Sequence, residues 1–404
     1  MKTSMMLVAA ACLAGVAGAA VPRVSNVRMT QDGKHRAKIT YEISEAPGIA
    51  TLDILTNGVP IGASVLTNAT GDVNKLLGVG PHQIVWKPWE TWPGHTFETA
   101  SVTAKVTVWP TNAPPDWLAV ELTKADYPVT YYATEDALPW GKIWQNKTYK
   151  GDVFLMRRIP ASHAQSFMGS PESEANRIAG RETRRMCTLT NDYYMAIFPT
   201  TFRHYYLLND HTATEARLTP VVTLSYNMLR YNTGNADNKA LPVNFPTTSR
   251  TFVGGTSYLK AWRDKTGLTF DLPTSAQWEY ACRAGMDTPI NWPGGTGSMD
   301  DLGVVCQLGK NCYEVGGKGA NSWYLFDTIG NCYEWVLDYF EGDSDPIPPD
   351  PVTDPFGPMS EPKVQRKIRG FHAQDIHKRA AFFTASEHLR KSQEIGFRLC
   401  VMLP

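Results

Sequence analysis

One short polar segment near the C-terminus combines residue types that bind metals. His372, Asp375 and His377 lie within six residues of each other, and imidazole and carboxylate groups are good ligands for zinc or iron. Ligands that are close in sequence do not have to converge in space. The same side chains are therefore also consistent with a polar loop that lines a cleft. The segment is a candidate metal site, with the polar loop as the alternative.

The first 20 residues have the composition of a targeting segment. Lys2 precedes an apolar run over residues 5–19, and Ala17-Gly18-Ala19 has the small residues of a cleavage site. This pattern predicts a secretory signal peptide over residues 1–20. The apolar run is shorter than the ~20 residues that a membrane-spanning helix needs. We therefore expect a secreted or periplasmic protein without a transmembrane segment.

Export changes what the cysteines can do. One of the 7 cysteines lies inside the expected signal peptide, and the others, beginning with Cys187, follow it. An even number of cysteines in an oxidising compartment favours disulfides. Cys306, Cys312 and Cys332 are close enough along the chain for a local bridge, although the sequence does not decide the pairing. Simple burial of a reduced thiol is the alternative, above all for Cys282 and Cys400.

Composition and charge limit the classes of partner. The 404 residues include 39 Lys and Arg and 39 Asp and Glu, so the formal net charge is zero. A neutral chain has no global field that would attract nucleic acid or an anionic membrane surface. With 43% hydrophobic residues, the chain has the composition of a globular protein, and its length favours two or three domains.

Residues 21–110 contain several segments in which apolar and polar residues alternate. The segments 37–43, 51–55 and 102–108 have this period of two, which places one face of a strand on a core and the other in solvent. Asn57-Gly58 is a hairpin signal. We therefore predict a small all-β sandwich of the immunoglobulin or fibronectin type over residues 21–110.

Three tryptophans lie close together in this region, at Trp86, Trp89 and Trp92. Their aromatic faces could stack on sugars, but large rings more often fill a core. We expect them to occupy the core and the edge of the sandwich. Residues 111–156 follow as a linker with lead-in strands, which we expect at residues 117–122 and 153–156.

The clearest local structure is a helix that begins after Thr274. Thr274 can cap this helix, and Gln277 three residues later completes a capping box. Glu279 and Arg283 are spaced for an ion pair one turn apart. Trp278 lies on the face that we expect to point into the core. These expectations follow from residue chemistry alone.

The stretch from Leu272 to Gly285 also resembles the signature of the formylglycine-generating, or sulfatase-modifying factor, family. Further segments resemble that family's motifs and occur in its order, at residues 167–171, 220–226, 321–335, 369–370 and 396–399. Several matches in order are strong evidence of a shared fold. The resemblance implies an α+β fold, in which an irregular domain related to C-type lectins occupies residues 157–404 behind the small sandwich.

The family's oxidases convert a cysteine of a client sulfatase into formylglycine with oxygen. They hold Cu(I) between two cysteines that follow an Arg-Gly motif, because thiolates suit this soft ion. Aligned on Arg369-Gly370, Asp375 and Ala380 stand at the two cysteine positions, and no cysteine lies between Cys332 and Cys400. A carboxylate and a methyl group do not form a dithiolate site. We therefore expect neither copper nor formylglycine formation by that mechanism.

The resemblance implies a calcium site instead. In the family, a Gly-Asn-x-x-Glu motif supplies oxygen ligands to Ca²⁺, the kind of ligand that this ion prefers. Asn331 and Glu334 match the motif, and the carbonyl group of Cys332 is the third candidate ligand. The alternative is that both side chains form hydrogen bonds with the surrounding backbone and no metal is present.

These features lead to three hypotheses of function. The first is an exported, non-catalytic or catalytically diverged protein of this family that binds a peptide, protein or glycan. The second is a formylglycine-generating oxidase whose thiols come from another place, such as Cys306 and Cys312. The third is a diverged iron or zinc enzyme, since some family relatives are non-haem iron enzymes. In those relatives the metal-binding histidines belong to a separate helical domain, for which this chain gives no signal.

Overall fold

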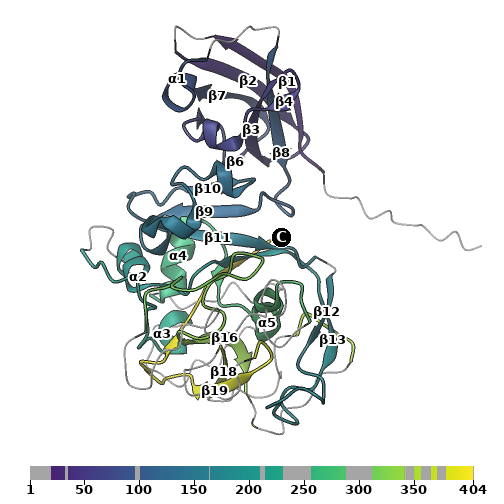
Figure 1. Ribbon diagram of the computed structural model, residues 1–404, viewed down its shortest axis with the longest axis vertical. Coiled ribbons are helices and arrows are strands. Elements are labelled where there is room, and N and C mark those ends of the chain that lie inside the picture. Colours follow the sequence, from purple (N-terminus) through teal and green to yellow (C-terminus); the bar gives the residue numbers. More distant parts are fainter. Residues whose placement is uncertain are drawn as a thin grey trace, which may run out of the picture.

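A computed structural model gives the fold of the protein (Figure 1). The structure describes residues 20–31, 35–95, 101–162, 164–209, 214–230, 256–287, 312–340, 342, 350–355, 365–370 and 379–403. Apart from Ala20, the expected signal peptide lies outside these residues. Figure 1 shows a β-rich N-terminal unit above a larger unit that contains the rest of the described chain. No helix in the described part of the chain is long and apolar enough to cross a bilayer.

Two small sheets form the N-terminal unit. The first has the order β1 (Arg23–Gln31), β2 (Ala37–Ser44), β7 (Gly80–Trp86), β5 (Thr70–Gly71), and the second consists of β4 (Val59–Pro60), β3 (Gly48–Thr56), β6 (Leu76–Leu77) and β8 (Val102–Trp109). Alternate residues of β2 are buried, and Ile39, Ile54 and Ile84 share one core between the sheets. The strands expected at 37–43, 51–55 and 102–108 are thus confirmed. The immunoglobulin or fibronectin type stays a prediction.

The hairpin between β3 and β4 depends on its two turn residues. Asn57 and Gly58 have φ angles of 51° and 78°, which is the left-handed region that a two-residue hairpin turn needs. Asn and Gly are the residues that adopt it at least cost. The hairpin signal in the sequence is therefore confirmed. Short helical turns complete this unit, η1 (Ala63–Leu66) and α1 (Pro88–Thr91).

A six-stranded sheet forms the centre of the larger unit. Its order is β10 (Val129–Tyr132), β9 (Trp117–Glu121), β11 (Val153–Ile159), β14 (Tyr193–Ala196), β21 (Cys400–Met402), β15 (Phe270–Asp271). The strands expected at 117–122 and 153–156 are β9 and β11, and both belong to this sheet. Between them lie the short helical turns η2 (Glu135–Ala137), η3 (Ile143–Gln145) and η4 (Lys147–Lys150).

The sheet separates two hydrophobic cores. Leu118 and Val120 of β9 point into one core, whereas Trp117 and Ala119 point into the other. Such strands are apolar on both faces because both faces are covered. Helices α2 (Phe202–Asn209), α3 (Tyr226–Arg230) and α4 (Tyr258–Thr266) contribute to the first core, and α5 (Ser275–Arg283) contributes to the second.

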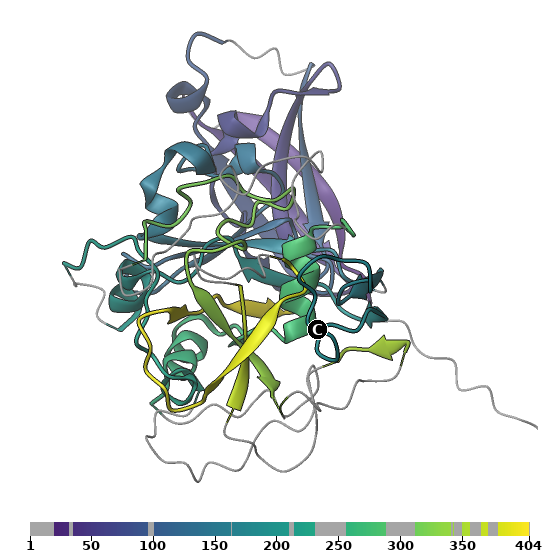
Figure 2. The same cartoon turned by 60° about the horizontal axis from the view of Figure 1, so that its bottom comes forward.

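Two smaller sheets complete the unit. One has the order β19 (Phe383–Glu387), β18 (Gln365–Arg369), β16 (Tyr333–Tyr339), β20 (Ile395–Gly396), and the other has the order β12 (Ala164–Met168), β13 (Arg185–Leu189), β17 (Val352–Thr353). Figure 2 brings this end of the molecule forward, with olive and yellow strands beside green helices. The mixture of sheets, short helices and long connections agrees with an irregular α+β domain. Its relation to C-type lectins stays a prediction.

The boundary between the units is a testable feature. Contacts between them include the bond from the Tyr131 amide to the Asn74 carbonyl (2.8 Å), and Ile49 reaches into the core beside α4. A fragment of residues 115–404 keeps the whole six-stranded sheet, so we expect it to unfold cooperatively. A fragment of residues 153–404 loses β9 and β10 and leaves one edge of β11 without its partner strand. We expect that fragment not to fold.

Circular dichroism and thermal unfolding of both fragments check this prediction. The boundary is wrong if residues 153–404 unfold as cooperatively as residues 115–404, or if residues 115–404 show no transition at all.

Candidate functional site

Helix α5 organises the region in which the family-like segments meet. Its capping box is formed, since the Thr274 hydroxyl accepts from the Gln277 amide (3.1 Å) and the Gln277 side chain accepts from the Thr274 amide (3.0 Å). The pair of Glu279 and Arg283 is also present, at 2.8 Å, and both side chains are buried. Trp278 points into a buried cluster, as expected. The expectations for this helix are therefore confirmed.

Glu279 joins three segments that are far apart in the sequence. Besides Arg283, it pairs with Arg369 of β18 (3.0 Å) and accepts from the Gly169 amide (2.8 Å). Burial, the largest influence, raises the pKa of the carboxyl group, but the two arginines and the amide outweigh it and hold the pKa below its ordinary value. The group is therefore a charged structural link between the helix, β18 and the turn after β12.

A second buried carboxylate, Glu334 of β16, faces a second arginine. Arg398 donates to both carboxylate oxygens, at 2.8 Å each, and the Trp278 indole donates to one of them (2.6 Å). Arg398 also donates to the Phe326 carbonyl (2.8 Å). Both charged side chains are almost fully buried, so each depends on the other for compensation. The sequence analysis missed this pair because its members lie 64 positions apart.

The turn expected to bind calcium has partners within the protein. Asn331 adopts a left-handed conformation (φ 67°), and its side chain accepts from the Tyr313 amide (3.0 Å) and donates to the Tyr313 carbonyl (3.2 Å). Cys332 follows in the same turn, with its amide bonded to Gly330. The Glu334 carboxylate faces Arg398 instead of this turn. The side chains of Asn331 and Glu334 thus have different partners within the protein, and calcium binding stays a prediction.

Asp327 is a buried carboxylate that the sequence analysis did not select. One oxygen accepts from the Gly316 amide (2.8 Å) and the Asn331 side chain (3.3 Å), whereas the other is buried without a partner among the described residues. Burial raises the pKa of this group from 3.8 to about 6. Its signal in the sequence was a single acid between apolar residues, in Leu-Phe-Asp-Thr-Ile.

Of the two positions aligned with the family's copper ligands, only Ala380 is described. Its side chain is completely buried in an apolar cluster with Trp278, Cys282 and Phe382, and its carbonyl group accepts from Arg369 (3.2 Å). Asp375 lies outside the described residues, as do His372 and His377 of the alternative metal site. The described part of the chain contains no group of three or more His, Cys, Asp or Glu side chains suited to a metal ion.

Arg379, beside this position, forms a further buried ionic group. It pairs with Glu174 (2.6 Å) and donates to Glu182 (2.9 Å) and to the Ser170 hydroxyl (2.8 Å). The chain just before Ala380 is thereby tied to the segment that follows β12. The sequence analysis named neither the arginine nor its acids, since their separation of about two hundred positions gives no local signal.

The described cysteines are reduced and buried, and the expected disulfide is not formed among them. Cys282 and Cys400 are packed in separate apolar clusters, as the alternative hypothesis foresaw. Cys312 instead lies against Cys332, in hydrogen-bonding contact between the two thiols, and this contact together with burial raises the pKa of Cys332. Cys306 lies outside the described residues. The expectation of a disulfide is corrected for the described cysteines, because each of their thiols is packed in an apolar cluster or forms a hydrogen bond.

The cavity nearest to these motifs is small and polar. It has a volume of about 40 Å³, and the residues that line it include Ser275, Glu279, Asp338, Lys367 and Arg369. Such a volume holds about one or two water molecules. Burial is the main reason that the pKa of Asp338 is raised, and its carboxylate accepts from the Ser275 amide (2.6 Å). The described charged side chains of this region are therefore paired with one another and stabilise the fold.

Removing the charge of Glu334 tests the buried pair. Glu334→Gln keeps the shape of the side chain but leaves the Arg398 guanidinium without a counter-charge, so we expect unfolding to become easier by about 3 kcal/mol. Urea unfolding of the full chain measures the change. Asp264→Asn is the matched control, because it breaks an ion pair with Lys260 at the surface and should change little. Equal effects of the two substitutions would contradict the assignment.

The pH dependence of stability tests Asp327. Its folded pKa, about 6, lies above the unfolded value near 4, so folding favours the protonated group. The stability that it contributes is greatest below the unfolded pKa and is lost as the pH rises through about 6. Asp327→Asn should therefore be more stable than the natural chain at pH 7.5, by about 3 kcal/mol at most. The difference should shrink towards pH 4.

Urea unfolding across this pH range gives the measurement, and a difference that does not change with pH contradicts it. The same experiment with added calcium tests the calcium prediction. A gain in stability of the natural chain that Asp327→Asn or Asn331→Ala abolishes would place the ion at this turn.

The chain was also compared with known protein families and solved structures. The sequence model of the "Sulfatase-modifying factor enzyme 1-like domain" matches residues 158–403. No match to a curated protein was found. Among solved structures, PvdO from Pseudomonas aeruginosa is similar, with 20% identity, a TM-score of 0.47, and coverage of 62% of this chain and 94% of that one. Treponema denticola variable protein 1 has 18% identity, a TM-score of 0.42, and coverage of 62% and 95%.

A third similar structure is that of CarF, with 13% identity, a TM-score of 0.37, and coverage of 62% of this chain and 99% of that one. At these TM-scores the assignment depends on the sequence match alone. That match spans more than half of the chain and contains each of the family-like segments described above. The chain therefore belongs to the family of the sulfatase-modifying factor enzyme 1-like domain.

Proposed function

We propose that this chain is an exported, catalytically diverged member of its family that binds a peptide or glycan ligand and does not form formylglycine at a copper site. The observation that carries the proposal is the environment of Ala380. Aligned on Arg369-Gly370, Ala380 stands where we expect a family cysteine, and its methyl group is packed against Trp278 and Phe382 with no exposed surface. A thiolate there would place a charge in an apolar cluster, and a substrate would reach it only if the cluster opened.

The nearest thiol does not replace the missing ligand. Cys282 belongs to the same cluster as Ala380, but burial raises its pKa to about 12. At neutral pH this thiol stays protonated, whereas copper binds the thiolate. Cys187 is similar, with its pKa raised to about 12 chiefly by burial. Both cysteines therefore serve the packing of the domain.

One observation favours the alternative of a copper-dependent oxidase. Cys312 and Cys332 bring two thiols into contact, and a pair of cysteines is a suitable ligand set for Cu(I). The sequence analysis had paired Cys312 with Cys306 for this role. Against the alternative, the pKa of Cys332 is raised, and the pair lies in a separate cluster from Ala380. The two hypotheses predict different results when Cu(I) is added to the protein.

A copper titration with the full chain separates these hypotheses. We expect no stoichiometric Cu(I) binding, and no conversion of a sulfatase-derived cysteine peptide when its mass is followed with oxygen present. Cys312→Ser should change neither result. Cys187→Ser is the control for the loss of an unrelated buried thiol.

The proposal fails if the natural chain binds one Cu(I) and converts the peptide, and Cys312→Ser abolishes both while Cys187→Ser does not. That result would instead establish the oxidase, with Cys312 as a copper ligand. Export has its own measurement, because residues 1–20 should be absent from the mature protein when its mass is determined.

A further inference from the structure

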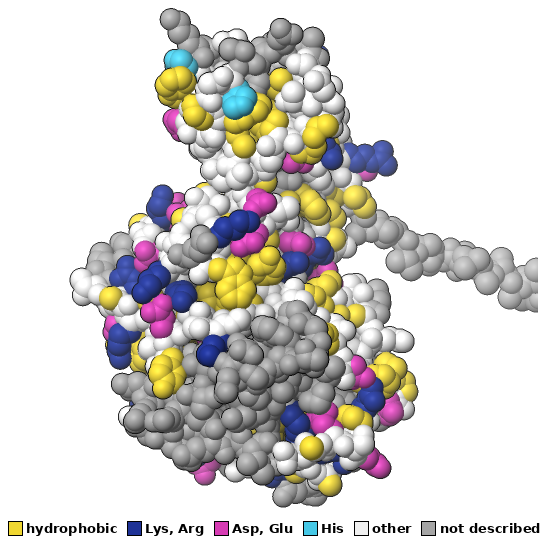
Figure 3. Space-filling model, in the orientation of Figure 1, with side chains coloured by type: hydrophobic (Ala, Val, Ile, Leu, Met, Phe, Trp, Pro, Cys, Tyr) yellow, Lys and Arg dark blue, Asp and Glu magenta, His cyan; other side chains and the backbone are white. Residues whose placement is uncertain are grey.

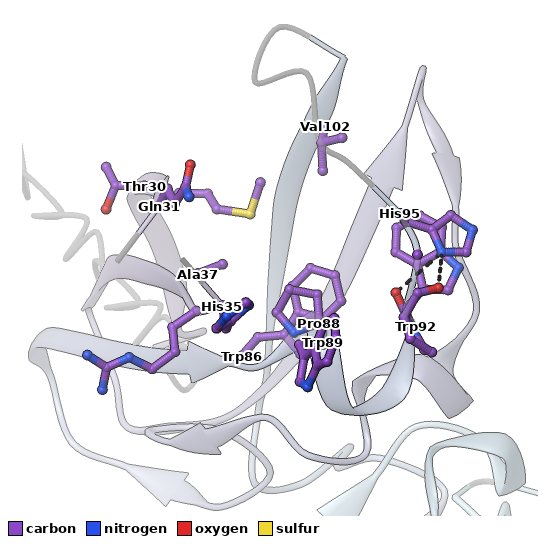
Figure 4. A pocket seen from close by; sticks show the side chains of 14 residues that line it. Thr30, Gln31, His35, Ala37, Trp86, Pro88, Trp89, Trp92, His95 and Val102 are labelled. Atoms are coloured by element: carbon purple, nitrogen blue, oxygen red, sulfur yellow. Dashed lines mark hydrogen bonds between the residues drawn. The ribbon is translucent and has the colours of Figure 1, made fainter. Parts of the chain in front are cut away.

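The N-terminal unit contains an aromatic cavity that lies outside the family domain (Figure 4). Its volume is about 320 Å³, which is in the range of pockets that hold small molecules. The residues that matter for its chemistry are Arg36 and two pairs of rings, His35 with Trp89 and Trp92 with His95. Figure 3 shows histidine side chains beside hydrophobic ones on this unit.

The side chain of Trp89 is exposed to solvent and does not belong to the core. Trp86, three residues earlier, is completely buried and donates from its indole to the Val65 carbonyl (3.1 Å). Trp89 has 62% of its surface exposed. The prediction that the three tryptophans fill the core and the edge is right for Trp86 and does not describe Trp89. A large exposed ring costs free energy of hydration, and this ring lines a cavity, where a ligand could cover it.

The short helix that carries Trp89 is fixed to the unit at several points. Pro88 occupies its first turn, and the Asn68 side chain donates to the Lys87 carbonyl (2.7 Å). At the other end, the Trp92 amide donates to the Pro88 carbonyl (2.7 Å), and the Thr91 hydroxyl donates to Val65. The ring is thus presented on a rigid support. A ligand that stacks on it loses little free energy to ordering the protein.

Two imidazole rings supply polar groups at the ring faces. The centre of the His35 ring lies 5.2 Å from that of Trp89, and His95 is stacked on Trp92 at 3.9 Å. The Nδ1 atom of His95 lies 3.1 Å from the Pro93 carbonyl and 3.3 Å from the Trp92 carbonyl. Because carbonyl groups only accept hydrogen bonds, Nδ1 is the donor in these two contacts. Hydrogen-bonding groups therefore flank the aromatic surfaces.

Several classes of ligand bind to aromatic cavities, and the charged residues that line this cavity favour some of them over others. The described residues that line it include Arg36 and no carboxylate. Among these described residues a cationic ligand such as a quaternary ammonium group finds no counter-charge, although aromatic faces attract such ligands elsewhere. A proline-rich peptide needs an extended aromatic groove, whereas this cavity is compact. A sugar ring fits the site, because it has apolar faces for stacking and hydroxyl groups around its edge.

We propose that this cavity binds one or two pyranose units of a neutral or acidic glycan, with a sugar face stacked on Trp89 and ring hydroxyls bonded to His35 and His95. The inference goes beyond the proposed function, since it concerns the N-terminal unit and holds whether or not the family domain is catalytic.

An array of neutral, uronic-acid and sulfated oligosaccharides, probed with the full mature chain, tests the proposal, and calorimetry with the best binder gives the affinity. Trp89→Ala should weaken binding about tenfold or more. Trp89→Phe should retain part of the affinity, because a smaller face remains. Trp89 is exposed, so thermal unfolding should confirm that each variant still folds.

Trp144→Ala is the matched control, since Trp144 is also exposed (55%) but lies in the larger unit. It should leave the affinity unchanged. The proposal is overturned if no oligosaccharide binds, if Trp89→Ala binds as well as the natural chain, or if Trp144→Ala is the variant that loses binding. Binding of a proline-rich peptide in competition with the sugar, and stronger than it, would assign the cavity to peptide recognition instead.

Discussion

The larger unit depends on arginines that are buried together with carboxylates. A charged side chain in an apolar interior is costly unless an opposite charge and hydrogen bonds compensate it. Here Glu334 meets Arg398 and Glu279 meets Arg369, each at 3.0 Å or less. Glu334 lies on β16, which also pairs with β20 beside Arg398, and Glu279 of α5 reaches Arg369 of β18. The ion pairs therefore add to strand pairing in fixing the relative positions of these elements.

This constraint explains which parts of the protein could be predicted from the sequence. The capping box at Thr274, the pair of Glu279 with Arg283 and the Asn57-Gly58 turn all depend on residues within a few positions of each other. Local propensity and periodicity report such contacts directly. The second partner of Glu279, Arg369, lies 90 positions away, and no spacing rule indicates it. Family resemblance named the segments that contain both residues but gave no role to their charges.

The candidate site illustrates a second limit of prediction from the sequence. Ala380 was predicted to stand at the position of a family cysteine, but only the structure shows that its methyl group is packed in a cluster with Trp278. Glu334 was expected to be a calcium ligand, and the structure turns it towards Arg398. Exposure of Trp89 likewise depends on how a four-residue helix is anchored, which its sequence does not reveal. The motifs thus located the segments that form the domain, whereas the contacts of these side chains became known only from the structure.

Strand β21 has a consequence for the order of events during biosynthesis. It pairs with β14 on one side and β15 on the other, and the neighbouring Arg398 supplies the buried guanidinium group. Until residues 398–402 have left the ribosome, β14 keeps an open edge and Glu334 has no counter-charge. Strands so distant in sequence also pair slowly. The six-stranded sheet of the larger unit is therefore complete only when the last strand of the chain is in place.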